Sequence, residues 1–272
     1  MIPEFGVSEM MVDLYKNFDK QLTHEHLFNW HKMLTKERKD LTDIGKYRTH
    51  EDPMQVVSGR LDKPTVHFEA PPSHKMKQEM EQFISWFNTT TNMLPLAKAG
   101  ITHLYFVCIH PFEDGNGRIA RALTEKSVAQ SVGHPALISL SKTIEAHKKA
   151  YYNALENNNK NLDITDWLLY FGQTILDAQE DTLKLIDFLI EKAKFFDRFS
   201  PLMNERQIKV TTRIFDAGHQ GFDGGLSADN YTKIAKTSAS TATRDLKDMV
   251  DKKIFIKTGE LKSTRYWLNI IN

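Results

Sequence analysis

Apolar residues recur every three or four positions along most of the chain, the spacing that gathers them on one face of an α-helix. A continuous apolar stretch, residues 101–109, indicates a buried helix that ends near His110, because a residue that precedes proline avoids helical backbone. The pattern predicts a mainly α-helical protein. The predicted helices cover about residues 8–18, 27–34, 72–94, 101–109, 118–130, 141–152, 163–196, 205–215, 227–234 and 240–250.

Two short runs before residue 70 are instead typical of β-strands. Residues 55–57 and 65–68 are rich in β-branched and aromatic side chains, and the turn-forming residues 58–64 separate them. This arrangement predicts a β-hairpin. A lone hairpin adds little to a helical core, so we expect either a functional flap or a structural hairpin beside the helices.

The pattern changes again at residues 199–201, Phe-Ser-Pro, which predicts a domain 1–200 and a second domain 201–272. The second domain has three predicted helices followed by two short strands, an order that resembles a winged helix-turn-helix. Residues 202–272 carry 12 Lys and Arg against 8 Asp and Glu. The helix expected to read DNA mixes both signs, and its acids would oppose phosphate. DNA binding by 202–272 therefore stays open, but docking of a protein is at least as well supported.

The densest chemistry lies in one run of twelve residues, 110–121, with the sequence HPFEDGNGRIAR. His110 is held at the end of a buried helix and can accept a proton when neutral at pH 7. Asp114 is placed to hold Mg²⁺, which prefers one or two carboxylates together with substrate phosphate oxygens. The run therefore combines a base with a metal ligand.

The second half of this run predicts a phosphate site. The residues Gly115, Asn116 and Gly117 can adopt positive φ and point successive N–H groups at one anion, at the start of the following helix. Arg118 and Arg121 are three residues apart, so both project from one helix face toward the same polyphosphate.

This run resembles the signature of the Fic family, HxFx(D/E)GNGRxxR, and matches it at every defined position. The resemblance implies a helical Fic core that transfers AMP from ATP to a protein hydroxyl, with ATP and Mg²⁺ as cofactors. It assigns roles residue by residue: His110 as the base, Phe112 as a buried anchor, Asp114 as the Mg²⁺ ligand, Gly115, Asn116 and Gly117 as the phosphate nest, and Arg118 and Arg121 as clamps on the β- and γ-phosphates.

The resemblance also gives the hairpin a function. In Fic proteins a β-hairpin flap covers the active site and pairs with an extended segment of the target, so we expect the target to dock on residues 55–68. Two further sets of residues are then expected to contact the nucleotide. Val56, Val57, Ser58 and Gly59 would border the ATP site, and Tyr151, Tyr152 and Asn159 would line its adenine end, although tyrosines on a helix are as often core residues.

Many Fic proteins carry an inhibitory helix, (S/T)xxxE(G/N), whose glutamate pairs with the second signature arginine. Two S/T-xxx-E matches occur here, 65–69 and 141–145, and alanine follows each of them. We interpret both as coincidental. Arg121 is then expected to be available to a γ-phosphate, in a form whose inhibitory helix was removed or comes from another chain.

Composition adds few constraints. The formal net charge is +1, Cys108 is the single cysteine, and no stretch reaches the roughly 20 apolar residues of a membrane span. A cytoplasmic protein without membrane association is expected. We predict an enzyme, a protein adenylyltransferase that modifies a Ser, Thr or Tyr hydroxyl of a target protein, including itself. The alternatives are removal of AMP or other nucleotidyl transfer at the same site, and a nucleotide-sensing regulator that binds DNA. Homodimer formation stays open.

Overall fold

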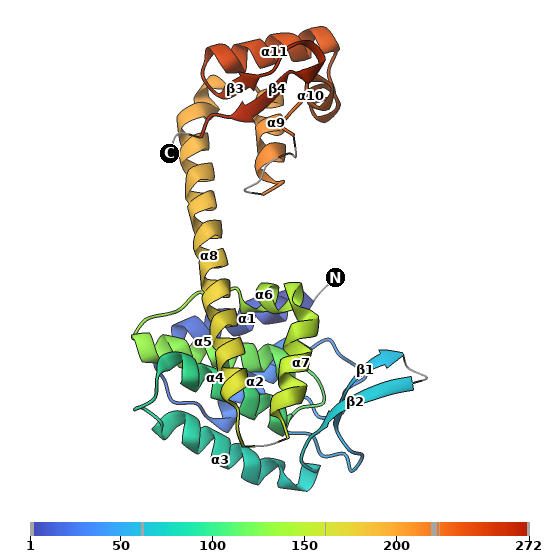
Figure 1. Cartoon of the computed structure of the whole chain (residues 1–272), viewed down its shortest axis with the longest axis vertical. Helices are drawn as coiled ribbons and strands as arrows, with labels where there is room; N and C mark the ends of the chain where they lie inside the picture. Colours follow the sequence, from blue (N-terminus) through green and yellow to red (C-terminus); the bar gives the residue numbers. More distant parts are fainter. Residues whose placement is uncertain (1–2, 61–62, 161, 219–221, 223, 271–272) are drawn as a thin grey trace. The chain divides into compact units, whose positions relative to one another are not determined.

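The computed structural model is mainly helical and describes residues 3–60, 63–160, 162–218, 222 and 224–270 (Figure 1). Of residues 3–4, 56–60 and 63–67 it describes the backbone alone. The chain divides into two compact units, residues 1–182 and 183–272, and each is described by itself.

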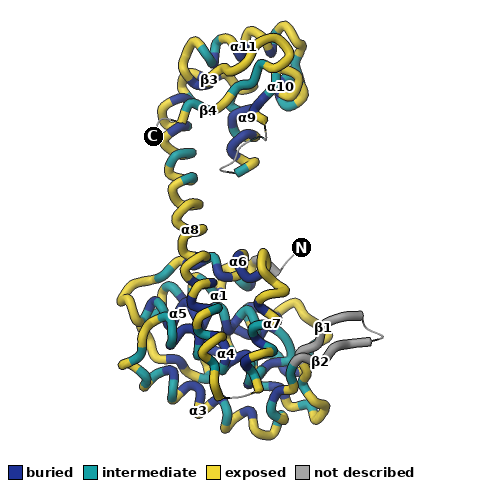
Figure 2. Tube along the Cα trace, viewed as in Figure 1, coloured by how far each residue is buried: buried dark blue, intermediate teal, exposed yellow. Residues whose placement is uncertain are grey.

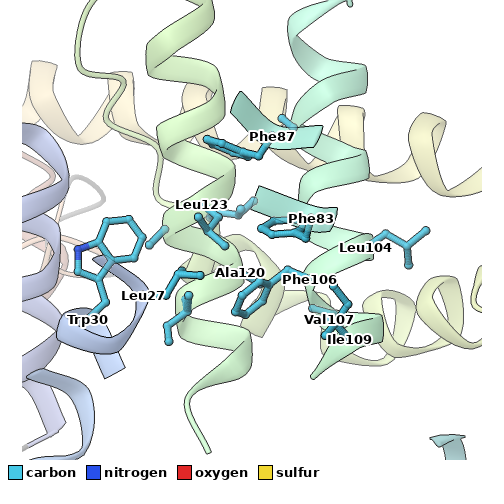
Figure 3. Packing of buried hydrophobic residues seen from close by; sticks show 14 of the residues in the cluster. Leu27, Trp30, Phe83, Phe87, Leu104, Phe106, Val107, Ile109, Ala120 and Leu123 are labelled. Carbon is cyan, nitrogen blue, oxygen red and sulfur yellow. The ribbon is translucent and has the colours of Figure 1, made fainter. Parts of the chain in front are cut away.

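Unit 1 is built around two long helices that pack against each other, α4 (Pro95–Ile109) and α5 (Asn116–Val132). Figure 3 shows buried side chains of α2, α3, α4 and α5 meeting in one core, among them Leu27, Phe83, Phe106 and Leu123. The loop between α4 and α5 carries most of the signature, so this core fixes both ends of that loop. The other helices of the unit are α1 (Pro3–Lys16), α2 (His24–Thr35), the short η1 (Ser73–Lys75), α3 (Met76–Thr89), α6 (Leu140–Ala146), α7 (Lys148–Asn158) and the first part of α8 (Thr165–Phe199).

Local sequence explains where several of these helices begin. The Thr23 hydroxyl accepts a hydrogen bond from the His26 N–H at the start of α2, and Pro95 occupies the first turn of α4. Gly6 explains how α1 approaches α2. A Cβ atom at Gly6 would lie 2.1 Å from the Met33 carbonyl oxygen, so only glycine fits there.

One segment predicted as a single helix forms two helices. The segment predicted as a single helix over 141–152 forms two, α6 and α7, which are separated at His147 with φ −118° and ψ 32°. The break lets each helix bury its own apolar residues, Leu140 and Ile144 in α6 and Tyr151 and Leu155 in α7.

The predicted hairpin is confirmed. Strands β1 (Gln55–Arg60) and β2 (Lys63–Glu69) pair antiparallel, with an irregularity in register between Val56 and Val57, and lie at one side of the helices of unit 1 (Figure 1). Both strands extend into the predicted turn 58–64, of which residues 61–62 lie outside the described residues. An Ala70 N–H to Met54 carbonyl hydrogen bond of 2.8 Å closes the base of the hairpin.

Unit 2 has its own buried core, to which Phe195 and Phe199 of α8 contribute together with Phe215, Tyr231 and Leu246. Figure 2 shows these buried stretches in α8, α9 and α11. Because the end of α8 packs here, the compact unit begins before residue 201, and the predicted domain boundary stays a prediction. Its remaining elements follow the predicted order: η2 (Ser200–Leu202), α9 (Glu205–Phe215), α10 (Ala228–Ala235), α11 (Ala239–Asp251), β3 (Phe255–Thr258), η3 (Leu261–Ser263) and β4 (Arg265–Leu268), with β3 and β4 antiparallel.

Candidate active site

The loop between α4 and α5 folds around one cavity of about 300 Å³. The acidic, basic and glycine residues of the signature all reach it, although they span twelve positions. The cavity is lined by His110, Glu113, Asp114, Gly115, Asn116, Gly117, Arg118 and Arg121. The structure thus brings the predicted base, metal ligand and phosphate-binding residues together.

His110 ends α4 in the left-handed conformation, with φ 51° and ψ 58°. Its Nδ1 lies 3.2 Å from the Val107 carbonyl oxygen, and a carbonyl only accepts, so Nδ1 carries the proton and Nε2 keeps its lone pair. Burial lowers the pKa of His110 from 6.5 to about 4. The imidazole is therefore neutral at pH 7 and can accept a proton through Nε2.

Asp114 is held by several donors at once. Its Oδ1 accepts the Gly115 N–H at 2.6 Å, and its Oδ2 lies 2.5 Å from Arg38 Nη1 and 3.2 Å from Arg118 Nη2. Despite partial burial, which raises it, the pKa of Asp114 stays below its usual value because of these donors and cations. Asp114 is therefore ionised at neutral pH.

The Gly-Asn-Gly segment differs in detail from the predicted nest. Gly115 has φ +84° and requires glycine, whereas Gly117 lies inside α5 and does not have positive φ. Asn116 has a different function again. Its side-chain amide accepts the Phe112 N–H at 3.0 Å and donates to the Phe112 carbonyl at 2.7 Å, which closes the loop on itself. Phe112 is fully buried, as predicted.

Arg118 and Arg121 both reach the cavity from the first turns of α5, as their spacing predicted. Arg118 is paired with Asp114. Arg121 is mostly buried, and among the described residues its Nε has no hydrogen-bond partner. Burial lowers the pKa of Arg121, yet a guanidinium stays charged in proteins. A buried cation without a bonded acceptor at Nε is suited to an anionic ligand.

The three residues predicted to line the adenine end of the site lie in two different places. The Tyr151 hydroxyl lies 2.8 Å from His103 Nε2 in the core, and Tyr151 is 5% exposed. Tyr152 and Asn159 instead line a small apolar recess with Phe68 of β2 and residues 107–108 of α4. Tyr152 and Asn159 are thus placed beside the hairpin, whereas Tyr151 faces the interior.

The predicted residues of the hairpin are only partly described. Val56, Val57, Ser58 and Gly59 belong to β1, and their backbone pairs with residues 64–68 of β2. Their side chains lie outside the described residues. Their contact with a nucleotide stays a prediction.

Four residues near the cavity were not predicted from the sequence. The Glu113 carboxylate accepts the N–H groups of Thr42 and Asp43, Arg38 pairs with Asp114, and Arg48 bonds the His110 carbonyl. The fourth, His31, stacks on Phe112 with ring centroids 4.2 Å apart. All four contacts join the signature to residues 31–48. No local pattern marks such long-range contacts.

Among the described residues, no group of three or more His, Cys, Asp or Glu side chains could hold a metal ion. Asp114 is a single carboxylate in a cavity lined with phosphate-binding groups. This donor set fits Mg²⁺ only when substrate phosphate oxygens complete its coordination. In the part of the chain that is described, no helix has both the length and the apolar composition needed to cross a membrane.

Comparison with known proteins places these features in a family. Residues 21–127 match the family model described as Fic/DOC family. Protein adenylyltransferase Fic of Aedes aegypti is 31% identical over 151 residues, which cover 54% of this chain and 28% of that relative. Protein adenylyltransferase fic-1 of Caenorhabditis elegans is 30% identical over 122 residues, 44% of this chain and 21% of that relative. The matched region spans less than a third of these relatives.

Solved structures agree at the level of the fold. A Fic family protein from Desulfovibrio desulfuricans G20 aligns with a TM-score of 0.54 at 20% identity, over 98% of this chain and 76% of that chain. Fic-1 from C. elegans aligns with a TM-score of 0.52 at 20% identity, over 69% of this chain and 53% of that chain. The family match over residues 21–127, the relatives and the shared fold together support a protein of the Fic family.

Proposed function

We propose that the chain is a protein adenylyltransferase, which transfers AMP from ATP to a Ser, Thr or Tyr hydroxyl of a target protein. One observation carries the proposal. A neutral histidine with its Nε2 lone pair available shares a cavity with Arg121, whose buried Nε has no bonded acceptor in the described part of the chain. A base beside an anion site is what the attack of a hydroxyl on a phosphate requires. Relatives named protein adenylyltransferase support the same reaction.

In the proposed reaction, the hydroxyl oxygen of the target attacks the α-phosphorus while His110 Nε2 takes its proton. The new oxygen–phosphorus bond forms as the bond to the β-phosphate oxygen breaks, and pyrophosphate leaves. Arg118 and Arg121 hold the leaving phosphates, and the Gly115 turn directs the start of α5 toward them. Asp114 would hold Mg²⁺, which would neutralise phosphate charge when bound.

Substrate positions follow from the surrounding elements. We assign the adenine ring to the recess lined by Tyr152 and Asn159. Residues 56–59 of β1 would border the bound nucleotide. An extended segment of the target would pair with the 55–68 hairpin and present its hydroxyl to His110. A segment of the same protein could dock in this way, so self-modification belongs to the proposal.

Isotope position tests the proposal directly. The chain would be incubated with Mg²⁺ and ATP labelled at the α- or the γ-phosphate, and label would be scored on itself and on lysate proteins. Transfer of the α-label alone is expected. His110→Ala should lose transfer and keep ATP binding. Label from the γ-position alone would contradict the proposal, as would an active His110→Ala variant. Release of AMP from a modified protein would favour the reverse, hydrolytic reaction.

We also propose that residues 201–272 form a winged helix-turn-helix domain, with α10 and α11 as the helix pair and β3 and β4 as the wing. The contacts of α11 offset part of its acidity. Asp245 is 6% exposed and bonds Arg206, and Asp248 bonds Lys252, so two of the three acids of the helix are paired. Asp251 is exposed, as are Arg244 and Lys247. Salt-dependent binding to duplex DNA that Arg244→Ala weakens would support this role.

A further inference from the structure

Arg48 is a buried cation that joins three separate parts of the chain. It is 1% exposed and comes from the irregular segment between α2 and β1. Its Nε donates to the His110 carbonyl at 2.8 Å, one terminal nitrogen donates to Ser73 Oγ at 2.8 Å, and the other donates to the Pro71 carbonyl at 2.5 Å. Its own N–H donates to the Pro111 carbonyl at 2.9 Å. Each of the three nitrogens of the guanidinium is thus bonded.

The contact with His110 holds a conformation that a histidine rarely adopts. A left-handed backbone is unfavourable for a residue with a side chain, so the surrounding structure must stabilise it. The Arg48 side chain donates a hydrogen bond to the His110 carbonyl, and the Arg48 backbone N–H donates to the Pro111 carbonyl. Because the imidazole follows its backbone, these two bonds set where Nε2 lies in the cavity.

The other donors of Arg48 hold the exit of the hairpin. Pro71 lies two residues after β2 ends, and Ser73 begins η1. The Ser73 hydroxyl donates in turn to the His50 carbonyl, so the hydroxyl that accepts from Arg48 is itself held in place by a hydrogen bond. One rigid planar group therefore bonds both the base of the hairpin and the backbone of the histidine.

We propose that Arg48 is a positioning residue that sets His110 in register with the hairpin on which the target docks. This role rests on the proposed function. Charge adds to this geometry. Burial is the main cause of the lowered pKa of His110, Arg48 lowers this pKa further and so favours the neutral base, and Asp114 acts in the opposite direction. Glu113, Arg118 and Arg121 line the same cavity.

Three variants separate geometry from charge. Arg48→Lys keeps the cation and loses the planar fork, Arg48→Met loses both, and Ser73→Ala removes one acceptor without touching His110. We expect Arg48→Lys and Arg48→Met to lower kcat about 100-fold, the loss typical of a misplaced catalytic group. ATP affinity should stay unchanged in both. Ser73→Ala should raise KM for the target protein more than it lowers kcat.

NMR of the His110 ring gives a readout that does not depend on transfer. The His110 pKa should rise in Arg48→Met and stay unchanged in Arg48→Lys, and the Nδ1–H tautomer should be lost or mixed in both. Arg206→Met, which removes an exposed arginine of unit 2, is the matched control and should change none of these values.

Normal kcat and an unchanged His110 pKa in Arg48→Met would overturn the proposal. If the wild-type chain transferred no AMP, the proposed function would fail, and the NMR titration would still decide whether Arg48 positions His110. If Arg48→Met did not fold, Arg48→Lys and Ser73→Ala would carry the test, and full activity with a normal tautomer in both would refute the role.

Discussion

The guanidinium of Arg38 forms an ion pair with the carboxylate of Asp114, Nη1 to Oδ2 2.5 Å, across 76 residues of sequence. Asp40 orients this arginine by accepting from Nε and Nη2 at 2.8 and 2.6 Å. The charge of the proposed magnesium ligand is thus neutralised by an arginine of the same chain. A metal ion must compete with Arg38 for the same oxygen.

We expect Arg38→Ala to strengthen metal binding. The substitution frees one lone pair on Asp114 Oδ2 and removes a positive charge beside the site, and both changes favour a divalent cation. The measurement is Mn²⁺ binding by electron paramagnetic resonance, without nucleotide and with a non-hydrolysable ATP analogue, where several-fold tighter binding is expected. Lys36→Ala, which removes a nearby surface ion pair with Glu9, is the control. Weaker Mn²⁺ binding in Arg38→Ala would show that Arg38 supports the site.

Gly115→Ala should damage transfer more than it damages stability. At φ +84° an alanine is strained by roughly 1–2 kcal/mol, whereas its Cβ would meet neighbours only at 3.6 Å or beyond. Gly133→Ala offers a matched control, because Gly133 has φ +80° and no neighbour within 4 Å of an added Cβ. Both variants should lose similar stability in urea unfolding, and only Gly115→Ala should lose ATP binding. Equal effects on binding would argue against a phosphate site at this turn.

Stability should fall as the pH drops below 6.5. The pKa values of His31 and His110 are lowered from 6.5 to about 4, and that of His103 to about 3, mainly by burial. The unfolded chain therefore binds more protons than the folded chain below pH 6.5, so the free energy of unfolding falls as pH drops from 6.5 toward 4. Urea unfolding at half-unit steps of pH would measure this decline.

On the alkaline side, Glu125 should dominate. Burial raises its pKa from 4.5 to about 8, so the folded chain binds the extra proton between these values and loses stability as pH rises from 6.5 to 8. Tyr15 donates to Glu125 at 3.0 Å. Glu125→Gln keeps a neutral polar group there and should flatten the alkaline decline. Because Glu125 opposes the histidines between pH 4.5 and 6.5, the acidic decline should become steeper in this variant. An unchanged pH profile would mean that Glu125 is ionised in the folded chain.

Asp245→Ala should destabilise unit 2 without direct effect on the cavity. The Asp245 carboxylate accepts from Arg206, from the buried Tyr231 hydroxyl at 3.0 Å and from Asn204. Truncation leaves a buried hydroxyl without this acceptor, which lowers the melting temperature of unit 2 by several degrees. Differential scanning calorimetry would resolve the change. Arg244→Ala, an exposed residue of the same helix, should leave the melting temperature unchanged.

Sequence reasoning was strongest where the determinants are local. The signature places its cavity residues within three helical turns, and helix α9 has the bounds 205–215 that the sequence pattern predicted. The break at His147 was missed because no proline or glycine marks it. Its cause is the burial of two different faces, which only the packed core reveals.

The contacts of Arg38 and Arg48 were missed for a similar reason. Each arginine lies in a polar segment of ordinary composition. The contacts of Arg38 with Asp114, and of Arg48 with Pro71 and His110, span more than 20 residues of sequence. For Tyr151 the sequence left two interpretations open, a nucleotide contact and a core residue. The hydrogen bond to His103 directs its hydroxyl into the core, and the nucleotide contact stays a prediction.

The amide of Asn116 bonds both the N–H and the carbonyl of Phe112, so residues 112–116 form a closed ring held without any ligand. A loop of this kind loses its conformational entropy during folding. Phosphate can then bind without a further entropic loss for ordering the loop, and affinity depends on charge and desolvation. Nucleotide binding should therefore be salt-sensitive, with a small change in heat capacity.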